Sequence, residues 1–388
     1  MKIHSFEYID RETNWRTEPV DFNNLTLLVG ASGVGKTRIL KSLGAIRSIA
    51  KGKSLNGVEW QICFSIENNK YFWEGKFEFS ERPSFSIIVN DEDIQKEKDS
   101  DKPIISFEKL TINETTIVER NNSTLIFRGE QTKLPLKAEQ SVVFLIPDPE
   151  ISKVEKAFRR IIFSDYTNSA RGYVNDGIKM LDEQFLSKYK NLDNIRNSEE
   201  PLTAKFYWVS KKDKKLFARI KEDFISVFPQ VEDVKMDPLA QLKDTPVQAF
   251  IKALPFIQFK EKDVKDWIPI MGISAGMYRT LIHIMELHLC ANGTVILIDE
   301  FENSLGVNCI DELTTEIKGA ANQIQFIITS HHPYIINSIS INNWKIVTRN
   351  GSSVSTQDAK DFQFHKSKHE AFIQLINSPE YKTGRKKA

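Results

Sequence analysis

The chain has 388 residues, of which 40% are hydrophobic and 27% are charged, as is usual for a globular protein. Its 53 basic and 52 acidic residues nearly cancel, so net charge gives no general argument for binding to nucleic acid or to a membrane. The three cysteines are too few and too scattered for a disulfide framework or a zinc site, which favours a reducing cytoplasm.

Nothing in the hydropathy pattern indicates export or membrane insertion. The N-terminal segment MKIHSFEYID lacks the basic head and apolar core of a signal peptide. No apolar run approaches the ~18 residues that a membrane-spanning helix needs. We therefore expect a cytoplasmic protein without a membrane partner.

The first predicted element is a strand at residues 25–29, because the run LTLLV is apolar, as in parallel strands covered on both faces. A glycine-rich loop follows, and then a helix in which Ile39, Leu43 and Ile46 recur at helical spacing. Residues 57–145 contain short aromatic and β-branched segments such as VEWQICFSI and YFWEGKFEFS. These segments are separated by Asn, Asp, Gly and Pro, which predicts an antiparallel β subdomain.

Residues 150–240 predict a helical insertion, and residues 245–388 return to an α/β pattern. In this last part, TVILI (294–298) and QFIIT (325–329) predict parallel strands, and the tail that begins WKIVTRNG predicts an edge hairpin before a short polar helix. The expected fold class is α/β. It comprises a single domain over residues 1–388, with a mixed or parallel core sheet, an antiparallel β layer and a helical insertion.

The loop after the first strand matches the phosphate-binding pattern Gly-x4-Gly-Lys-Thr in full. Glycines let backbone N–H groups turn inward around phosphate oxygens, and the helix N-terminus adds positive charge. Lys36 is expected to reach the β- and γ-phosphates of ATP, and the Thr37 hydroxyl to bind Mg²⁺. The alternative is a chance glycine-rich turn, which does not account for the strand before it and the helix after it. The residues expected to contact ATP are Gly30, Ala31, Ser32, Gly33, Val34, Gly35, Lys36, Thr37 and Arg38.

Two carboxylates, Asp299 and Glu300, follow the predicted strand TVILI. Burying charge beside an apolar run is costly unless a partner compensates it. If the strand TVILI lies beside the strand before the phosphate-binding loop (the P-loop), Asp299 is placed near Mg²⁺ and Glu300 near the γ-phosphate. Glu300 could then act as a general base toward water. The alternative is an ordinary polar strand end, which is common in isolation.

Two further segments have the spacing of an ATP site. Ser274, followed by Ala275 and Gly276, begins a predicted helix whose N-terminus suits a phosphate, although a Ser-capped helix explains the same residues. Ser274 precedes Asp299 by 25 residues, a span that fits one helix, a turn and one strand. His331 follows the strand QFIIT at the edge where α/β proteins bind ligands, and a surface histidine is the alternative.

In this order, the P-loop, the Ser-x-Gly segment, Asp-Glu and the strand-end His resemble the ATPase head of ABC-type proteins, in the SMC/RecF/OLD branch. KDWIPIMGISAGMYRTL resembles the signature region of that branch, and ILIDEFENSLG resembles its Walker B segment and D-loop. TSHHPYIIN resembles its switch-histidine segment, usually Thr-Ser-His-Ser-Pro, which favours His331 over His332. The resemblance covers residues 1–50 and 245–350 well, and residues 57–150 in outline.

The resemblance implies a P-loop NTPase head of the ABC type that hydrolyses ATP. It implies Mg²⁺ contacts from Thr37 and Asp299, and catalysis by Glu300 assisted by His331. The family also has a Gln ligand for the metal on a loop after the antiparallel layer, for which Gln140 is the candidate.

The resemblance further implies that ATP is sandwiched between two copies of the chain. Ser274 and Gly276 of one copy would contact the γ-phosphate held by the other. Asn303 and Ser304 would lie in the D-loop, across the same interface.

The chain's length separates the functional alternatives. The helical insertion is too short for the long coiled coil of an SMC or DNA-repair ATPase, and the 57 residues after His331 leave no room for the nuclease domain that OLD proteins append. Such compact heads resemble ATPase subunits of bacterial antiphage systems, including PARIS. The leading hypothesis is therefore an ATPase that acts as sensor or scaffold for a separately encoded effector, a nuclease or toxin.

Two other functions remain as alternatives. A DNA-repair or DNA-maintenance ATPase would act directly on DNA, and the cluster KKDKK at 211–215 could contact phosphates, although it also fits a solvated helix face. A transporter ATPase is disfavoured because the sequence has no clear transporter-type coupling segment.

Overall fold

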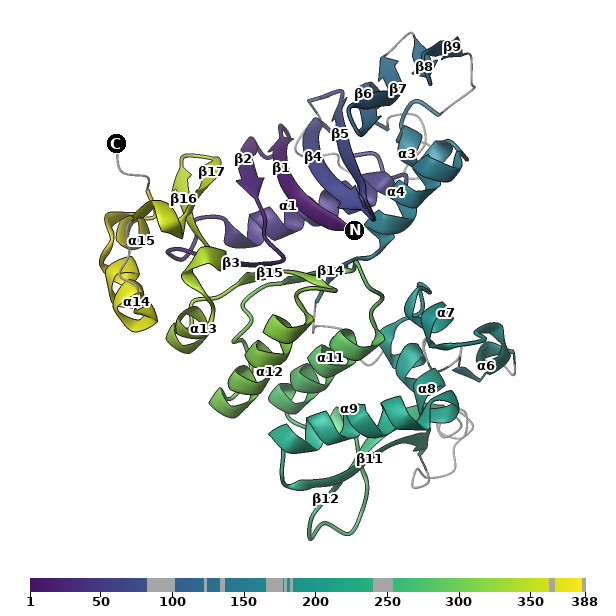
Figure 1. The fold of residues 1–388 in the computed structure, drawn as a ribbon, viewed down its shortest axis with the longest axis vertical. Coiled ribbons are helices and arrows are strands. Elements are labelled where there is room, and N and C mark those ends of the chain that lie inside the picture. The colour runs from purple at the N-terminus through teal and green to yellow at the C-terminus, as the bar shows by residue number, and fades with distance from the viewer. Residues whose placement is uncertain are drawn as a thin grey trace, which may run out of the picture. The chain divides into compact units, whose positions relative to one another are not determined.

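The chain folds into two units, each of which contains its own sheet (Figure 1). The first unit comprises residues 1–164, 293–300 and 322–388, and the second comprises residues 165–292 and 301–321. None of the helices that can be described is both long and apolar enough to cross a membrane. The computed structural model describes residues 1–81, 102–121, 124–132, 137–164, 177, 180–181, 184–239, 254–362 and 367–385.

Parallel strands form the part of the first unit's sheet that carries the P-loop. β10, β14, β15, β3 and β16 are neighbours in this order, and each neighbouring pair is parallel. Every residue of β14, β15 and β3 is buried, as expected for strands covered on both faces. The bounds are Ile161–Phe163 (β10), Val295–Ile298 (β14), Gln325–Thr329 (β15), Leu25–Val29 (β3) and Trp344–Asn350 (β16).

The strand order corrects two expectations from the sequence. β15 lies between β3 and β14, so the strand that precedes Asp299 is not directly beside the P-loop strand. β16 pairs with β3, and its hairpin partner β17 (Ser353–Asp358) pairs with β2 (Trp15–Asp21), so this hairpin is inside the sheet and not at its edge. Both expectations are wrong because an apolar run indicates that a strand is buried but does not specify its neighbours.

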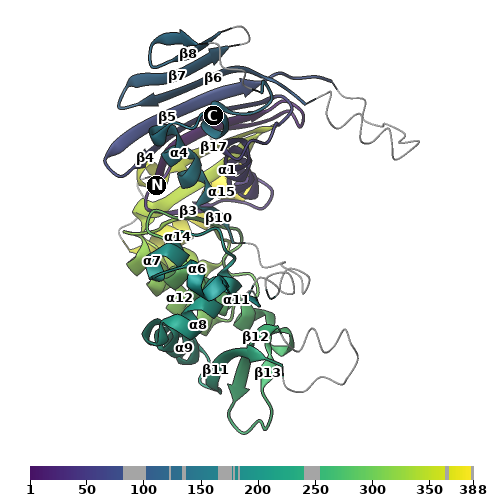
Figure 2. The ribbon, with the colours of Figure 1, turned by 90° about the vertical axis from the view of Figure 1, so that its right-hand side faces the viewer.

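The antiparallel part of the sheet continues from β2 through β1, β4, β5, β6, β7 and β8 to β9 (Figure 2). Alternate residues of β4 and β5 are buried. Phe64 and Trp73 pack edge-to-face on Phe158 of helix α4 (Pro149–Arg159), with their ring centroids 5.2 and 5.1 Å from that of Phe158. Helix α1 (Lys36–Ala50) contributes Ile39 and Leu43 to the same core. The remaining strands are β1 (Lys2–Asp10), β4 (Val58–Ile66), β5 (Asn69–Phe77), β6 (Ile105–Ile112), β7 (Thr115–Asn121), β8 (Leu125–Phe127) and β9 (Glu130–Thr132).

Helices complete the first unit at several points of its sheet. α4 packs on both α1 and β4, and α15 packs on β16. The other helices of this unit are α3 (Val142–Leu145), α4 (Pro149–Arg159), α13 (Pro333–Ser338), α14 (Lys368–Asn377) and α15 (Pro379–Thr383).

The second unit is largely helical, with a small antiparallel sheet of order β11-β12-β13. α8, α9, α11 and α12 pack on one another, because each has a buried apolar face. The bounds are α6 (Phe185–Lys188), α7 (Leu192–Arg196), α8 (Leu202–Lys212), α9 (Lys214–Val227), β11 (Val231–Pro238), β12 (Pro255–Glu261), β13 (Ile268–Pro269), α11 (Ala275–Leu289) and α12 (Val307–Ala320). The two units together confirm the fold class expected from the sequence, α/β with a mixed core sheet, an antiparallel layer and helices.

Candidate functional site

The P-loop joins β3 to α1 through three glycines with positive φ. The φ values of Gly30, Gly33 and Gly35 are 156°, 79° and 105°. A Cβ atom on Gly35 would lie 2.6 Å from Cγ2 of Val354, so a larger residue would combine a strained backbone with a steric clash. α1 begins at Lys36 with no side-chain cap and no acidic residue in its first turn. A helix N-terminus of this kind suits an anionic ligand.

The Lys36 side chain lies across the P-loop. Its Nζ donates to the carbonyl oxygens of Gly30 and Ala31, at 2.9 Å each, and the residue is only 6% exposed. The positive charge is therefore held inside the loop, where its interaction with an anion is screened less by water. Thr37, the next residue of α1, lines the same cavity of the structure as Lys36, which is described below.

Asp299 and Glu300 are held in place by Thr329, at the carboxyl end of β15. β14 and β15 pair in parallel as far as Ile298 and Ile328, so the residues that follow them meet at one edge of the sheet. Thr329 Oγ1 donates to Asp299 Oδ1 at 2.6 Å and accepts from the backbone N–H of Glu300 at 2.8 Å. Glu300 has φ +47°, a left-handed backbone conformation that is uncommon for residues other than glycine. Where such conformations occur, they are concentrated at functional sites.

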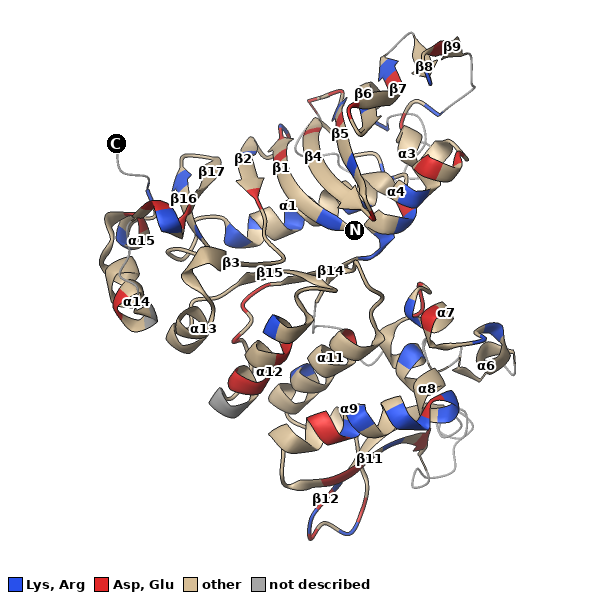
Figure 3. Ribbon diagram, in the orientation of Figure 1, with Lys and Arg blue, Asp and Glu red and all other residues tan. Residues whose placement is uncertain are grey.

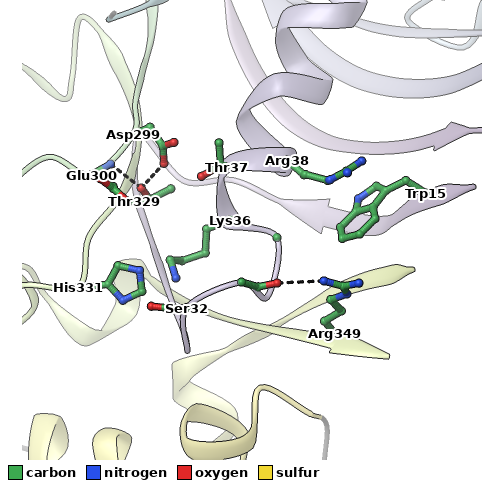
Figure 4. Close-up of a pocket in the computed structure, with 12 residues that line it drawn as sticks. Trp15, Ser32, Lys36, Thr37, Arg38, Asp299, Glu300, Thr329, His331 and Arg349 are labelled. Carbon is green, nitrogen blue, oxygen red and sulfur yellow. Dashed lines mark hydrogen bonds between the residues drawn. The ribbon is translucent and has the colours of Figure 1, made fainter. Parts of the chain in front are cut away.

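The P-loop, the start of α1, the two carboxylates and Thr329 all line one cavity of about 350 Å³ (Figure 4). All of these residues belong to the first unit. This volume lies in the range of small-molecule sites. Its basic and acidic side chains suit an anion accompanied by a divalent cation, and a hydroxyl and a carboxylate are oxygen ligands of the kind that Mg²⁺ prefers. The lining residues are Trp15, Ser32, Gly33, Gly35, Lys36, Thr37, Arg38, Asp299, Glu300, Thr329, His331 and Arg349.

Of the two adjacent histidines, His331 lies at the cavity. Figure 4 shows its imidazole on the same side of the cavity as Lys36 and Ser32. His332 instead caps α13, because its Nδ1 accepts from the backbone N–H of Tyr334 at 3.3 Å. The structure therefore gives the two histidines different surroundings.

Three of the lining residues, Trp15, Thr329 and Arg349, were not predicted from the sequence. The guanidinium groups of Arg38 and Arg349 lie 4.1 and 4.8 Å from the ring centroid of Trp15, one on either side of the indole in Figure 4. Arg349 Nη1 also donates to the carbonyl oxygen of Gly33 at 3.2 Å. Thr329 could have been found from its position just before the strand-end His, but Trp15 and Arg349 come from β2 and β16, which only the strand order brings to the P-loop.

Gln140 lies at the opposite end of α1 from the P-loop. Its Nε2 donates to the carbonyl oxygen of Gly52, which follows the last turn of α1, at 3.4 Å. The 15 residues of α1 span roughly 22 Å at ~1.5 Å per residue. Arg120 Nη2 anchors this segment by donating to the carbonyl of Gln140 at 2.9 Å and to the buried Glu108 at 3.1 Å. This placement does not support the role of Mg²⁺ ligand that the resemblance implies for Gln140.

Ser274 and Gly276 belong to the second unit and are not among the described residues that line the cavity. Ser274 is the N-cap of α11, and its Oγ accepts from the backbone N–H of Met277 at 3.2 Å. The cavity thus brings Ser32, Gly33, Gly35, Lys36, Thr37 and Arg38 together with Asp299, Glu300 and His331 within one unit. Of the other residues expected to contact ATP, Gly30, Ala31 and Val34 are not among the described residues that line it, and Val34 is buried in the core.

Comparisons with known proteins support the class of the site. The sequence matches the model of one protein family over residues 25–337, and the family is described as "AAA domain, putative AbiEii toxin, Type IV TA system". No curated protein matches the sequence.

Several solved structures resemble the fold at low sequence identity. An Smc head bound to the C-terminal winged-helix domain of ScpA has a TM-score of 0.46 and 14% identity, covering 92% of this chain and 98% of that one. The Smc head with an extended coiled coil from Pyrococcus furiosus, bound to the C-terminal domain of ScpA, has a TM-score of 0.46 and 13% identity, covering 93% and 97%. The SMC head domain from Thermotoga maritima has a TM-score of 0.42 and 9% identity, covering 92% and 99%.

The family match includes the P-loop, Asp299, Glu300 and His331, and it spans most of the chain. Since the cavity also brings these residues together, sequence and geometry indicate the same class of site. The chain belongs to this AAA-domain, AbiEii-type family, and it is a P-loop ATPase.

Proposed function

We propose that the chain is a cytoplasmic ATPase that pairs with a second copy of itself on ATP and thereby controls a separately encoded effector. The observation that carries the proposal is the single cavity that Lys36, Thr37, Asp299, Glu300 and His331 line together. A cation, a hydroxyl, two carboxylates and an imidazole can together bind phosphate and Mg²⁺ and activate a water molecule for ATP hydrolysis.

Each group has a distinct task in the proposed reaction. The P-loop backbone and Lys36 bind and orient the phosphates. Thr37 and Asp299 would supply oxygen ligands for Mg²⁺, which would neutralise phosphate charge. Glu300 accepts a proton from the attacking water, and His331 donates a hydrogen bond to the γ-phosphate as negative charge develops there.

The end of the cavity at Trp15 is suited to the nucleoside. Arg38 and Arg349 flank the indole, and both are exposed, so the outer face of a guanidinium can stack on a base as a flat cation. We propose that the base and ribose lie at this end, with the phosphates on the P-loop.

Replacing Arg349 with Met is expected to weaken ATP binding about fivefold, since a stacked cation contributes ~1 kcal/mol. Binding of inorganic tripolyphosphate should be unchanged, because that ligand has no base. Equilibrium titration with each ligand measures the ratio. Arg16→Ala is the matched control, because Arg16 is a neighbour of Trp15 in sequence but pairs with Glu7 at 2.8 Å. An equal loss for both ligands would mean that Arg349 acts on the phosphates, directly or through the P-loop carbonyl of Gly33, and not on the base.

Pairing of two copies is proposed because Ser274 and Gly276 lie in the second unit while the cavity lining belongs to the first. We propose that Ser274, at the N-terminus of α11, contacts the γ-phosphate bound to the partner copy. ATP would then be part of the interface, and its hydrolysis would loosen the pair.

Substituting Ser274 with Ala is expected to weaken ATP-dependent dimerisation at least tenfold, because one hydrogen bond to a charged phosphate is worth about 1.5–3 kcal/mol. Sedimentation with and without ATP, in the Glu300→Gln background, measures the dimer. Asn191→Ala removes a comparable helix cap, from α7, and should not change dimerisation. Unchanged dimerisation of the Ser274 variant would refute the sandwich.

The proposal that the chain acts with a second, separately encoded protein is motivated by the family description, which names both the AbiEii toxin and a toxin–antitoxin system. Such a system has two components by definition, so a compact ATPase in it would act with a separately encoded protein. We propose antiphage defence as the setting and a nuclease or toxin as the effector. Co-expression with the product of the neighbouring gene tests this. A complex that ATP hydrolysis releases supports the proposal, and a neighbour that neither binds nor becomes toxic contradicts it.

The alternative, direct action on DNA, has one observation in its favour. Lys and Arg residues recur on α8 and α9, including the cluster at 211–215 (Figure 3). However, Lys211 already donates to Asp237 at 3.2 Å, and Lys214 donates to the carbonyl of Ser210. DNA affinity that falls steeply with salt and is abolished by charge reversal at Lys212 and Lys215 would favour this alternative.

A further inference from the structure

One face of α11 contacts the loop of residues 301–304, which we call the 301–304 loop. Gly276 and Arg279 are three positions apart and therefore share a face of the helix. A Cβ atom on Gly276 would lie 2.7 Å from the backbone oxygen of Ser304, so the loop packs directly on the helix backbone. Arg279 Nη1 donates to the backbone oxygen of Asn303 at 2.5 Å. Arg279 thus holds the carbonyl group of Asn303, and the next carbonyl group, that of Ser304, packs against the helix at Gly276.

The same face of the helix also holds the start of the loop. His283, one turn beyond Arg279, packs edge-to-face on Phe301 with ring centroids 5.3 Å apart. His283 and Phe301 are 2% and 0% exposed, so this contact is part of the core of the second unit. The His283 ring is itself oriented by Glu286, whose Oε2 lies 3.2 Å from Nδ1. The helix therefore fixes the loop at its base and near its tip.

The tip of the loop faces solvent although its anchors are buried. Asn303 and Ser304 are exposed, whereas Arg279 is 3% exposed. Ser304 has φ +61°, a left-handed conformation that costs a non-glycine residue roughly 1 kcal/mol and persists only where the surrounding contacts enforce it. Its Oγ donates to Asn303 Oδ1 at 3.2 Å. The tip of the loop is exposed and strained, and the buried Arg279 holds it through the Asn303 carbonyl. Such an arrangement can present the side chains of the tip to another protein surface.

We propose that Arg279 is a positioning residue, which holds the 301–304 loop in the conformation that a second copy of the chain recognises. The inference rests on the proposed pairing of two copies on ATP. Because Gly276 belongs to the signature segment and packs on the same loop, the partner copy meets the α11 N-terminus and the loop as one preformed surface. Arg279 acts through the Asn303 carbonyl and touches neither ATP nor the reacting water.

The test compares Arg279 variants in the full-length Glu300→Gln chain. Arg279→Ala is expected to weaken ATP-dependent dimerisation roughly tenfold, measured by sedimentation, because a charge-assisted hydrogen bond to the loop is lost. ATP affinity of the monomer, measured at low protein concentration, should be unchanged, since the cavity lies in the first unit. Arg279→Lys keeps the charge but not the planar fork, so it should restore the dimer in part.

The control is His288→Ala on the same helix. His288 Nε2 lies 2.5 Å from Asp223 Oδ2 of α9, away from the 301–304 loop, so its loss perturbs α11 without touching the loop. This variant should dimerise like its parent. If Arg279→Ala fails to fold, hydrogen exchange of residues 301–305 in the Arg279→Lys monomer replaces it, and faster exchange than in the parent is expected.

The outcomes separate this inference from the proposed pairing. Dimerisation of Arg279→Ala equal to that of the parent, or unchanged exchange in the loop of Arg279→Lys, would overturn the positioning role. A Glu300→Gln parent that stays monomeric with ATP would instead refute the pairing, and with it the partner that this inference assigns to the loop. If Arg279→Ala loses the dimer while the parent and the His288→Ala control keep it, and if the Arg279→Ala monomer retains its ATP affinity, the result supports both the positioning role and the pairing.

Discussion

Replacing Glu300 with Gln is expected to leave ATP bound while lowering its hydrolysis about 100- to 10,000-fold, the usual contribution of a general base. Gln has nearly the shape of Glu but cannot accept the proton of the attacking water. The backbone N–H of Glu300, which donates to Thr329 Oγ1 at 2.8 Å, is retained, so the geometry beside Asp299 should survive. Phosphate release at saturating ATP and equilibrium ATP binding measure the two effects separately.

The matched control for this prediction is Glu312→Gln. Glu312 is an exposed residue of α12, and the same chemical change there should leave turnover as it is. Normal hydrolysis by the Glu300 variant would remove Glu300 from the catalytic role. Loss of ATP binding together with hydrolysis would mean that Glu300 holds the ligand and does not serve as the base.

Replacing Lys36 with Ala should weaken ATP binding roughly 30-fold or more, because truncating one member of a buried charged contact costs ~2–5 kcal/mol. Lys36 is 6% exposed and donates to the P-loop carbonyls. Its attraction for an anion is therefore weakly screened, and a water molecule that fills its place would bind the anion less strongly. The effect should be at least as large for inorganic tripolyphosphate as for ATP, because we propose that Lys36 contacts the phosphates and not the base. Titration calorimetry with both ligands measures this.

Lys41→Ala is the control for the Lys36 variant. Lys41 lies on the same helix but is exposed, so its removal should change affinity less than twofold, as expected of a screened surface charge. Thermal unfolding of both variants shows whether α1 remains folded. ATP affinity of Lys36→Ala close to that of the unchanged chain would exclude the P-loop as the phosphate site.

The local features of the site could be predicted from the sequence. The run at residues 25–29, the glycines after it and the helix that starts at Lys36 form one continuous segment, whose conformation depends on nearby residues. The same holds for Asp299 and Glu300, which follow a fully buried strand directly. Each of these patterns combines an apolar run with a polar end, so it contains enough information to predict both a strand and the residues at its edge.

Only the tertiary structure decided which strands are neighbours and which distant residues reach the cavity. The insertion of β15 between β3 and β14 brings Thr329 to Asp299, and the interior position of β16 brings Arg349 to the P-loop beside Trp15. The buried pair that anchors Gln140 places it far along α1. The physical reason is that strand order and register arise from packing among segments far apart in the chain, whereas hydrophobic periodicity specifies only which face of a segment is buried.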